Sequence, residues 1–534
     1  MSSVTSNLIP TLERSAALVK AWGAGRLPDG RTLEETLTVE GVPLWDVMAP
    51  TLAFYNVPKA LSTALPRNVL RRHLRAYVSR VKHQVFDLVT RRKNMRGCSR
   101  WPAGEQTPVF LGFNAYMYRD ILQPVCSELL RRGEQAIVLH DWRRFLNTAE
   151  ITGGDELHSI WEHWDGEAQT FARQLGASYR RMRDALEQPA LLAQLIRDEQ
   201  GQPLWPQMEE SFLWMLRAFL PWILPQIAVA RHILRQHRPA LLVTPESPCL
   251  DPHAQIYYAL ACQEAIPVLD VQFGVLSNEA FEYCFIRGQR IAAWSDNSRE
   301  TFIAHEVPPE KIVITGSPRH DCMVNVSAGE VRHTRAKLGV PYGRKMALFA
   351  STYSVAAYSQ MADPGILSQV KRAVCQVSGR MEGLCLVVKP HPLENVKETK
   401  RLAAGCPNII FADKKSDIRE LTRACDVFIT LGSTATMDAL IARKLVIWPA
   451  FPKLVWWDDQ YLKFGAVLVA QDEEALGACL RQVVDGESEK ILAKLDGPRN
   501  NLLRQWTHEC DGQATSRVIA LMRKMTGQRQ AEPK

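Results

Sequence analysis

The sequence predicts an α/β protein with two doubly wound parallel sheets and a helical N-terminal extension. Its 534 residues are enough for two or three domains. Residues 384–452 alternate short β-branched runs with a helical pattern, in the order strand, tight turn, helix and strand. Similar alternation occurs at 108–139 and at 240–271. We therefore expect one α/β domain over residues 106–325 and a second over 340–490.

Composition favours an ordinary globular protein. Hydrophobic residues make up 46% and charged residues 23% of the chain, which argues against disorder. The 12 cysteines form no CxxC pair or other metal-ligand spacing, so we expect reduced thiols and no metal site. The first residues lack a basic start followed by an apolar core, so no secretory signal is expected. These features predict a cytoplasmic protein.

Residues 1–105 read as a helical extension that contains a strongly basic segment. In residues 67–100 many arginines and lysines accompany a single acid, Asp87, and apolar residues recur at helical spacing. One interpretation is a helix packed on its own domain with a solvated basic face. The other is peripheral docking on an anionic membrane, at the inner face of the cytoplasmic membrane, or on an anionic glycan. Nucleic acid is not expected, because no known binding module accompanies the charge.

The first α/β domain is expected to open with a strand at Pro108–Phe113 and a loop at Asn114–Arg119. A helix and a second strand at Gln135–Leu139 should follow. Residues 155–238 then predict a Trp-rich helical insertion. Within it, Ser211–Ala230 approaches the length of a membrane span, but it contains Arg217, Pro221 and Pro225, so a buried helix is the favoured interpretation.

Two further strands of this domain should deliver polar residues to one edge of the sheet. The strand Ala240–Pro245 ends at Glu246, and the strand Pro267–Val271 ends in Gln272-Phe273-Gly274. Carboxyl ends of parallel strands are where such sheets bind ligands. Glu246 is the first choice for a general base or a substrate-orienting group, because a carboxylate at this edge can remove a proton from a bound hydroxyl. Asp251 and His253 are alternatives.

The end of the first domain and the start of the second offer further candidates. The strand Ile312–Thr315 leads into Gly316, Ser317 and Arg319. Gly316 permits close approach, and Arg319 can make a forked contact to a phosphate or carboxylate, or a surface salt bridge. After a polar linker, the strand Lys345–Ala350 is expected to end in a turn with Ser351 and Thr352, whose hydroxyls can meet a phosphate.

Residues 384–452 carry the most informative pattern. His391-Pro392 follows the first strand of this stretch directly. The turn Gly432-Ser433-Thr434 precedes a helix, so its hydroxyls and the first N–H groups of that helix can form an anion site. Asp438 lies one helical turn further on, where a carboxylate can accept hydrogen bonds from a ribose. Plain helix capping, a structural histidine and a solvated aspartate are the alternative interpretations.

These motifs resemble a known family. The runs V-K-P-H-P, S-D-I-x-E-L, D-V-F-I-T-x-G-S-T-A-x-x-D-A-L and V-I-W-P, from Val388 to Pro449, look like the nucleotide-binding half of GT-B glycosyltransferases. The resemblance is to bacterial capsule and surface-polysaccharide enzymes, which include polysialyltransferase-like and CDP-glycerol transferase enzymes, with UDP-N-acetylglucosamine 2-epimerase as a relative. Residues 291–321 also resemble the segment that closes the first domain of such enzymes.

The resemblance implies roles for particular residues. His391, Ser433 and Thr434 would hold the nucleotide phosphates and Asp438 the ribose, with Pro392 and Gly432 part of the same motifs. Asn114, Tyr116 and Arg119 would line a cleft between the domains, together with Gly274. The helical tail, residues 491–534, would cross back to the first domain. Relatives commonly have Gln-His-Gly where this chain has Gln272-Phe273-Gly274, so no imidazole is expected there.

The resulting functional prediction is a GT-B glycosyltransferase. It would pass a sugar from a nucleotide-sugar donor to a glycan or lipid-linked acceptor, without a cofactor or metal, because no Asp-x-Asp motif ends a strand. Glu246 would deprotonate the acceptor, and the imidazolium of His391 would stabilise the departing phosphate. The alternatives are a CDP-polyol phosphotransferase, an epimerase-like enzyme, and a noncatalytic binding or scaffold protein.

Overall fold

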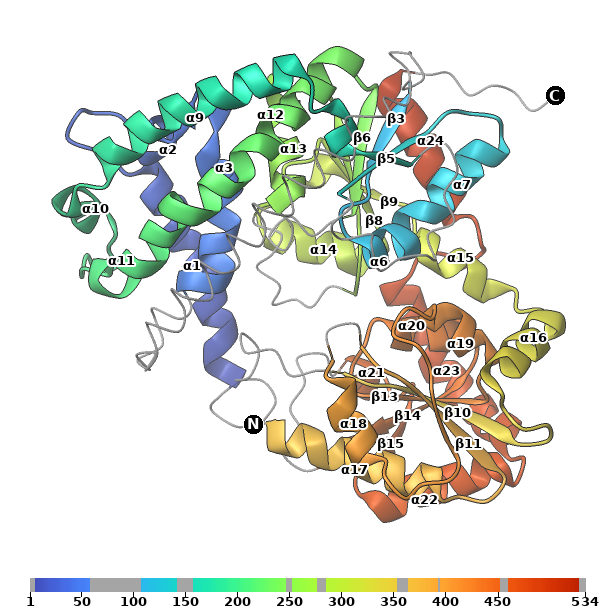
Figure 1. Ribbon diagram of the computed structural model, residues 1–534. Coiled ribbons are helices and arrows are strands. Elements are labelled where there is room, and N and C mark those ends of the chain that lie inside the picture. Colours follow the sequence, from blue (N-terminus) through green and yellow to red (C-terminus); the bar gives the residue numbers. More distant parts are fainter. Residues whose placement is uncertain are drawn as a thin grey trace.

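The computed structural model consists of two α/β domains (Figure 1). It describes residues 5–57, 107–141, 157–245, 252–275, 285–352, 364–391, 394–451 and 460–527. In this part of the chain, a seven-stranded sheet has the order β5-β4-β3-β6-β7-β8-β9 and a six-stranded sheet the order β12-β11-β10-β13-β14-β15. All pairings within both sheets are parallel. The predicted fold class of two doubly wound domains is therefore confirmed.

The strands are short apolar runs. Helices cover both faces of a doubly wound sheet, so the central strands read as nearly continuous hydrophobic segments rather than alternating ones. The strands of the first sheet are β3 Pro108–Leu111, β4 Ile137–His140, β5 Leu157–Ser159, β6 Leu241–Pro245, β7 Val268–Val271, β8 Arg290–Ala293 and β9 Ile312–Ile314. Those of the second are β10 Lys345–Ala350, β11 Leu384–Lys389, β12 Ile409–Phe411, β13 Val427–Thr430, β14 Leu445–Pro449 and β15 Leu468–Ala470.

Most of the helices up to residue 304 belong to the N-terminal extension and the first domain. They are α1 Thr5–Ala24, α2 Leu33–Thr36, α3 Leu44–Thr51, α6 Ala115–Met117, α7 Gln123–Arg131, α9 Gly166–Leu186, α10 Pro189–Leu195, α11 Trp205–Trp214, α12 Leu220–His237, α13 Pro252–Gln263 and α14 Asp296–Ala304. Short π-helical or 3₁₀ segments are η1 Leu52–Asn56, η2 Tyr118–Leu122, η3 Ile160–His163, η4 Met215–Phe219 and η6 Pro309–Lys311.

The remaining helices link the domains, cover the second sheet or form the C-terminal tail. They are α15 Pro318–Val324, α16 Ala328–Leu338, α17 Pro364–Gly379, α18 Val396–Leu402, α19 Ile418–Ala424, α20 Ala435–Ile441, α21 Gln460–Lys463, α22 Glu473–Val484, α23 Ser488–Trp506 and α24 Ala514–Thr526. The tail crosses between domains: α24 packs on α7 and β6, beside the first sheet (Figure 1). Its Val518 and Ile519 belong to the same buried cluster as Phe110 of β3.

Three sequence expectations are wrong in detail. The stretch 155–238 is not wholly helical, because it contains β5, which pairs with β4 at the edge of the first sheet. Residues 114–119, expected as a loop, are helical from Ala115 onward. A two-residue hairpin, β1 Thr38–Val39 and β2 Val42–Pro43, occurs in the N-terminal extension. All these strands are two or three residues long, too short for a periodic signal.

The basic segment 67–100 lies outside the described residues.

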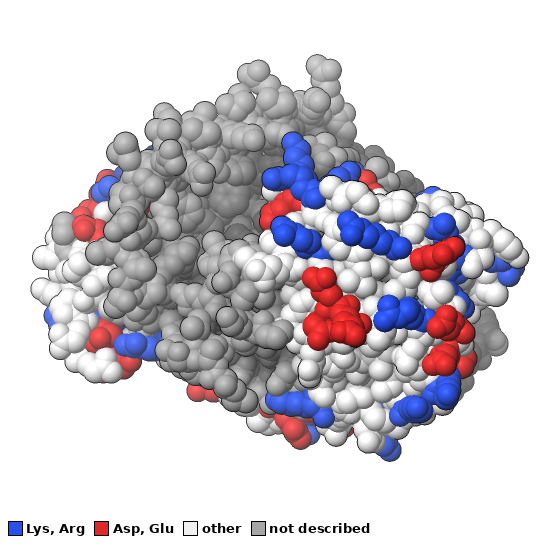
Figure 2. Space-filling view, turned by 90° about the horizontal axis from the view of Figure 1, so that it is seen from below, with Lys and Arg blue, Asp and Glu red and all other residues white. Residues whose placement is uncertain are grey.

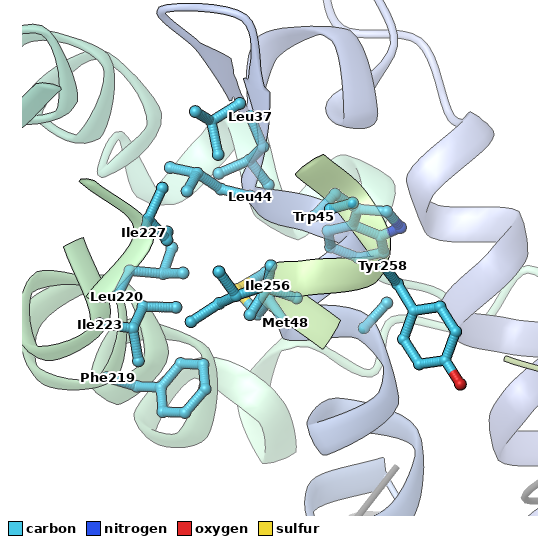
Figure 3. Close-up of a cluster of buried hydrophobic side chains, with 14 of the residues drawn as sticks. Leu37, Leu44, Trp45, Met48, Phe219, Leu220, Ile223, Ile227, Ile256 and Tyr258 are labelled. Atoms are coloured by element: carbon cyan, nitrogen blue, oxygen red, sulfur yellow. The ribbon is translucent and has the colours of Figure 1, made fainter. Parts of the chain in front are cut away.

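The largest core lies between the N-terminal helices and the first sheet (Figure 3). Trp45 and Met48 of α3 and Ile223 and Ile227 of α12 belong to this cluster, and all four side chains are buried. Among the described residues, one helix is long and apolar enough to cross a membrane, Trp205–His237, and 61% of its most apolar window is buried. Helix α12 packs against α9 and α13. This arrangement agrees with the expected buried helix.

Charges of both signs are interspersed on the face shown in Figure 2. The chain carries 65 Lys and Arg against 57 Asp and Glu. On the described part of this face the positive excess is not gathered into one patch.

Candidate functional site

The strand order of the second sheet places the candidate residues at one edge. Strand β10 lies between β11 and β13, and the chain turns in opposite directions on either side of it, which is the point where such sheets bind ligands. Register aligns Lys389, Ala350 and Thr430 at the carboxyl ends of these strands. Neighbouring strands are about 4.8 Å apart. The loops that begin after Lys389 and after Thr430 therefore start about 10 Å apart, on either side of Ser351.

His391 lies in the tight turn that follows β11. Its backbone N–H donates to Glu394 Oε2 at 3.0 Å, and the N–H of Glu394 donates back to the carbonyl of His391 at 2.9 Å. Burial, together with the nearby Lys389 ammonium, lowers the pKa of His391 to about 4. The imidazole is therefore neutral at pH 7, in contrast to the imidazolium expected from the sequence. Pro392 lies outside the described residues.

Lysine side chains surround this turn. Lys389 is 7% exposed and its Nζ donates to the carbonyls of Pro390, at 3.0 Å, and Lys414, at 2.8 Å. Burial and the Arg119 guanidinium lower the pKa of Lys389 to about 8. Lys414 Nζ donates to the carbonyl of Glu394. The ammonium groups of Lys389 and Lys414 thus donate to backbone carbonyls beside this turn, and an anionic ligand would stabilise such an environment.

The turn after β13 completes this edge. Gly432 has a positive φ of 88°, a conformation that favours glycine. Ser433 Oγ accepts from the N–H of Ala435 at 3.2 Å, but Thr434 adopts helical dihedrals and makes no side-chain capping bond. A Cβ on Gly274 would lie 3.3 Å from Thr434 Oγ1. The turns that follow β7 and β13 therefore meet, one from each domain.

Asp438 does not face open space as a ribose contact would require. Its side chain is fully buried, and Arg319 donates to its two oxygens, Nε at 3.0 Å and Nη2 at 2.5 Å. Arg319 Nη1 also donates to Asp120 of the first domain. Burial opposes the charge of Arg319, but the carboxylates of Asp438 and Asp120 outweigh it and raise the pKa of this guanidinium. Asp438, expected as a ribose contact, is instead held in an ion pair between domains. The forked contact expected of Arg319 is made to this carboxylate, and the pair is buried rather than at the surface.

A second set of contacts joins the domains beside this pair. Arg419 pairs with Asp417 at 2.7 Å, and its Nη1 donates to the carbonyl of Asp120 at 3.3 Å. Arg119 pairs with Asp120 at 2.8 Å and donates to the carbonyl of Lys415 at 3.1 Å. The sequence placed Arg119 at the domain cleft, and the structure brings it against the loop that follows β12.

Other candidates from the first domain have internal partners. Asn114 Oδ1 accepts from the N–H groups of Tyr116 and Met117, so it caps the helix that follows. Gln272 is buried and its amide bonds to Gly274 and Trp294. Gly316 lies against Ala514 at the start of α24 rather than facing a ligand space. The structure therefore gives these residues supporting roles.

The last candidates divide between the two sheets. Ser351 Oγ donates to Glu394 Oε1 at 2.9 Å, which brings it together with His391, and Thr352 follows it, half-buried. Ser317 is buried at the start of α15 and makes no side-chain capping bond. Glu246 and Asp251 lie outside the described residues.

Sequence reasoning missed two arrangements: the contacts of Glu394, and the pairing of Asp141 with His253, which it named only as an alternative to Glu246. Glu394 is 4% exposed and bonds to groups from several elements around His391. His253 lies 3.6 Å from Asp141, which follows β4, and its ring stacks on Phe113, which follows β3. An acid three residues after a histidine in a predicted turn was the available signal for Glu394. No sequence signal pairs Asp141 with His253, because they are far apart in the chain.

The two doubly wound sheets, which meet at the turns after β7 and β13, define the class of fold: it is the two-domain GT-B architecture. Residues 292–447 match the family model of CDP-glycerol:poly(glycerophosphate) glycerophosphotransferases. This match spans the end of the first domain and both turns at the edge of the second sheet. A comparison with curated protein sequences finds no match.

Solved structures show the same fold. A variant of the wall teichoic acid polymerase TagF with CDPG is 13% identical, with a TM-score of 0.52, and the match covers 86% of this chain and 98% of that one. A UDP-N-acetylglucosamine 2-epimerase is 12% identical, with a TM-score of 0.51, covering 80% of this chain and 98% of that one. At these identities the likeness concerns the fold alone.

Proposed function

We propose that this protein is a transferase that uses a nucleotide-activated donor, with a CDP-polyol such as CDP-glycerol as the first candidate. One observation carries this proposal: the cations around His391 and the turn at Ser433 and Thr434 share the carboxyl edge of one sheet, within the stretch that the family model matches. A diphosphate would add negative charge beside the buried Lys389 ammonium, whose hydrogen bonds go to the carbonyls of Pro390 and Lys414. The sequence alone put a sugar donor first, and the family match favours the polyol instead.

The reaction would be a phosphoryl transfer. A hydroxyl oxygen of the acceptor attacks the phosphorus that carries the polyol, the bond between that phosphorus and the bridging oxygen breaks, and CMP leaves with the electron pair. The hydroxyl proton passes to a general base, for which Glu246 remains the proposal. The imidazole of His391 can donate a hydrogen bond to the departing phosphate, and Lys389 can balance its charge. The acceptor would be a glycan or a lipid-linked surface polymer.

Sugar transfer from a nucleotide sugar is the second candidate. It is favoured by the resemblance of Val388–Pro449 to the nucleotide-binding half of GT-B glycosyltransferases. Both candidates use the same phosphate site but differ in the bond that breaks. Polyol-phosphate transfer from a CDP-polyol releases CMP, whereas sugar transfer from a nucleoside diphosphate sugar releases the nucleoside diphosphate.

Further features of the proposal concern the setting of the enzyme. We propose a cytoplasmic protein of a bacterial cell, acting in surface-polymer synthesis without a cofactor or a bound metal. The basic segment 67–100 would bring it to the anionic inner face of the cytoplasmic membrane, where each basic residue adds about 1 kcal/mol. Vesicle sedimentation with and without anionic lipid tests this contact.

The activity is tested by a binding screen followed by product analysis. Thermal shift with CMP, CDP, UDP and GDP identifies the nucleotide, since a ligand that binds the native state raises the melting temperature. Chromatography of the nucleotide released from CDP-glycerol and from UDP-N-acetylglucosamine then separates the two candidates. CMP release from CDP-glycerol supports the first. Binding of no nucleotide would overturn both and favour a scaffold role.

A further inference from the structure

Glu394 stands at the centre of the contacts around His391. Its Oε2 accepts the backbone N–H of His391 at 3.0 Å. Its Oε1 accepts from Ser351 Oγ at 2.9 Å, Lys371 Nζ at 2.7 Å and Thr399 Oγ1 at 2.5 Å. The two carboxylate oxygens therefore have separate tasks. One holds the turn of His391, and the other binds groups from the end of β10, from α17 and from α18.

The position of Glu394 is fixed from every side. Its own N–H donates to the carbonyl of His391, and its carbonyl accepts from Lys414 Nζ. The side chain is 4% exposed and Thr399 is 1% exposed, so these bonds are shielded from water. A hydrogen bond to a charged acceptor is stronger than one between neutral groups, and more so where water is excluded. The turn of His391 is thus anchored to the loops that follow β10 and β12.

The contacts of Glu394 include more than a stabilising salt bridge with Lys371. A carboxylate needed only to pair with Lys371 would not have to accept the amide of His391, since backbone N–H groups in a turn can bond to water. The bond from His391 N fixes where the turn, and with it the imidazole, stands relative to Ser351. A displacement of about 1 Å in a catalytic group can reduce turnover about a hundredfold.

We propose that Glu394 is the positioning residue for His391: it sets the turn so that the imidazole meets the donor phosphate. This inference rests on the proposed function, because it concerns the same phosphate site. Glu394 does not itself touch the substrate in this assignment, and its effect on turnover is exerted through His391.

Glutamine at this position is a selective probe. A carboxylate has two acceptor oxygens, whereas the amide of glutamine has one acceptor and one donor group. In Glu394→Gln the single oxygen can face Lys371 and its neighbours or the N–H of His391, but not both. When the glutamine oxygen faces the Lys371 ammonium, the glutamine NH₂ group faces the N–H of His391, and two donors cannot form a hydrogen bond. The substitution therefore keeps the shape and volume of the side chain and removes one hydrogen bond.

The test is a double-mutant cycle of Glu394→Gln and His391→Ala, read as CDP affinity by calorimetry and as turnover of CDP-glycerol. Thr399→Val is the matched control, because it removes one donor from Oε1 and leaves the His391 bond in place. We expect Glu394→Gln to lower turnover about tenfold, the effect of one mispaired buried hydrogen bond, with KM changed less than kcat. In the His391→Ala background the same substitution should change turnover less than about twofold.

The outcomes are separable. If Glu394→Gln lowers turnover by the same factor in the wild-type and in the His391→Ala background, Glu394 is merely structural and the inference is overturned. The same conclusion follows if Thr399→Val lowers turnover as much as Glu394→Gln does, at an equal loss of melting temperature. The number of CDP sites per chain in each variant shows whether turnover falls because less protein is folded. If the wild-type protein binds none of the nucleotides, the proposed function falls first. If it binds CDP and only the cycle fails, the proposed function stands without this role.

Discussion

At the scale of single residues, the protonation state of His391 decides what it can do. With a pKa of about 4, caused by burial and by the ammonium of Lys389, the ring is neutral near pH 7 in the unliganded protein. A neutral imidazole donates one hydrogen bond but brings no charge. A bound phosphate would favour the protonated ring and raise its pKa, because an opposite charge stabilises the charged form. Ligand binding and proton uptake are therefore coupled.

This coupling predicts that CDP binding takes up a proton at His391 when the pH lies between the unliganded and liganded pKa values. Titration calorimetry at pH 6 in buffers with different enthalpies of ionisation measures it: the observed enthalpy should vary with the buffer. His391→Asn should remove most of that variation, and the part that remains belongs to the nucleotide. Equal buffer dependence in both proteins would mean that the ring of His391 does not respond to the phosphate.

His391→Ala tests the contribution of the ring to turnover. We expect at least about a hundredfold loss with the preferred donor, the usual loss for a group that stabilises charge in the transition state. Unchanged kinetics in a folded variant would remove His391 from the mechanism.

At the scale of elements, short helices are joined by a buried ion pair. Arg319 of α15 and Asp438 of α20 are 4% and 0% exposed, and Asp120 of η2 binds the same guanidinium. Both charges lose their hydration, so each depends on the other for stabilisation. The pair therefore fixes where α20, which begins at the turn of Ser433 and Thr434, lies relative to the first domain.

Removing one partner of this pair should be costly. Asp438→Asn leaves the Arg319 guanidinium buried with one charged partner fewer, and we expect a loss of about 3–5 kcal/mol. The midpoint of urea unfolding measures it. Arg319→Met with Asp438→Leu should recover only part of this loss, because two apolar residues replace two charges but the buried Asp120 loses one of its guanidinium partners. The exposed pair of Arg443 and Glu489 is the control, since Arg443→Ala should change stability by less than about 1 kcal/mol.

The C-terminal helix α24 should contribute to the stability of the first domain. Ile519 is 1% exposed in a cluster with Phe110 of β3. Ile519→Ala creates a cavity there, and we expect a loss of about 2–4 kcal/mol, seen as a lower melting temperature. Lys524→Ala on the exposed side of the same helix should change stability by less than about 0.5 kcal/mol. Equal effects of the two substitutions would show that α24 does not hold the first domain.

At the scale of the whole molecule, one buried and two half-buried histidines make stability depend on pH. Burial lowers the pKa values of His140, His163 and His391 to about 4. In the unfolded chain a histidine has a pKa of about 6.5. Between these values the unfolded state binds more protons than the folded state, so stability rises with pH. The stability is complete above about pH 6.5 and is progressively lost down to about pH 4.

The melting temperature should therefore fall steadily from pH 7 to pH 4.5. Each fully titrating histidine contributes up to about 1.4 kcal/mol per pH unit to this slope. His140→Gln should reduce the slope, whereas the same change at the exposed His333 should leave it unaltered. Scanning calorimetry over a pH series provides the measurement. A flat profile in the wild-type protein would show that these histidines are not buried in solution.

The features that the sequence could predict are those whose signals lie close together along the chain. The two doubly wound sheets, the turn after β13 and the place of His391 after β11 are set by local signals: β-branched runs, a glycine with positive φ, and a histidine at a strand end. These signals lie within a few residues of each other, so one sequence is enough to find them. The two- and three-residue strands β1, β2 and β5 carry no such signal.

Only the tertiary structure determined the partners. Arg319 and Asp438 are 119 positions apart, and Arg119 reaches Lys415 across both domains. Hydrogen bonds and charge pairs depend on where side chains meet in space, and a charged residue looks the same in sequence whether it faces a ligand, water or another charge. For this reason an acid that the sequence predicts as a ribose contact is one half of a buried ion pair. The residue types and strand ends of the proposed phosphate site were already visible in the sequence.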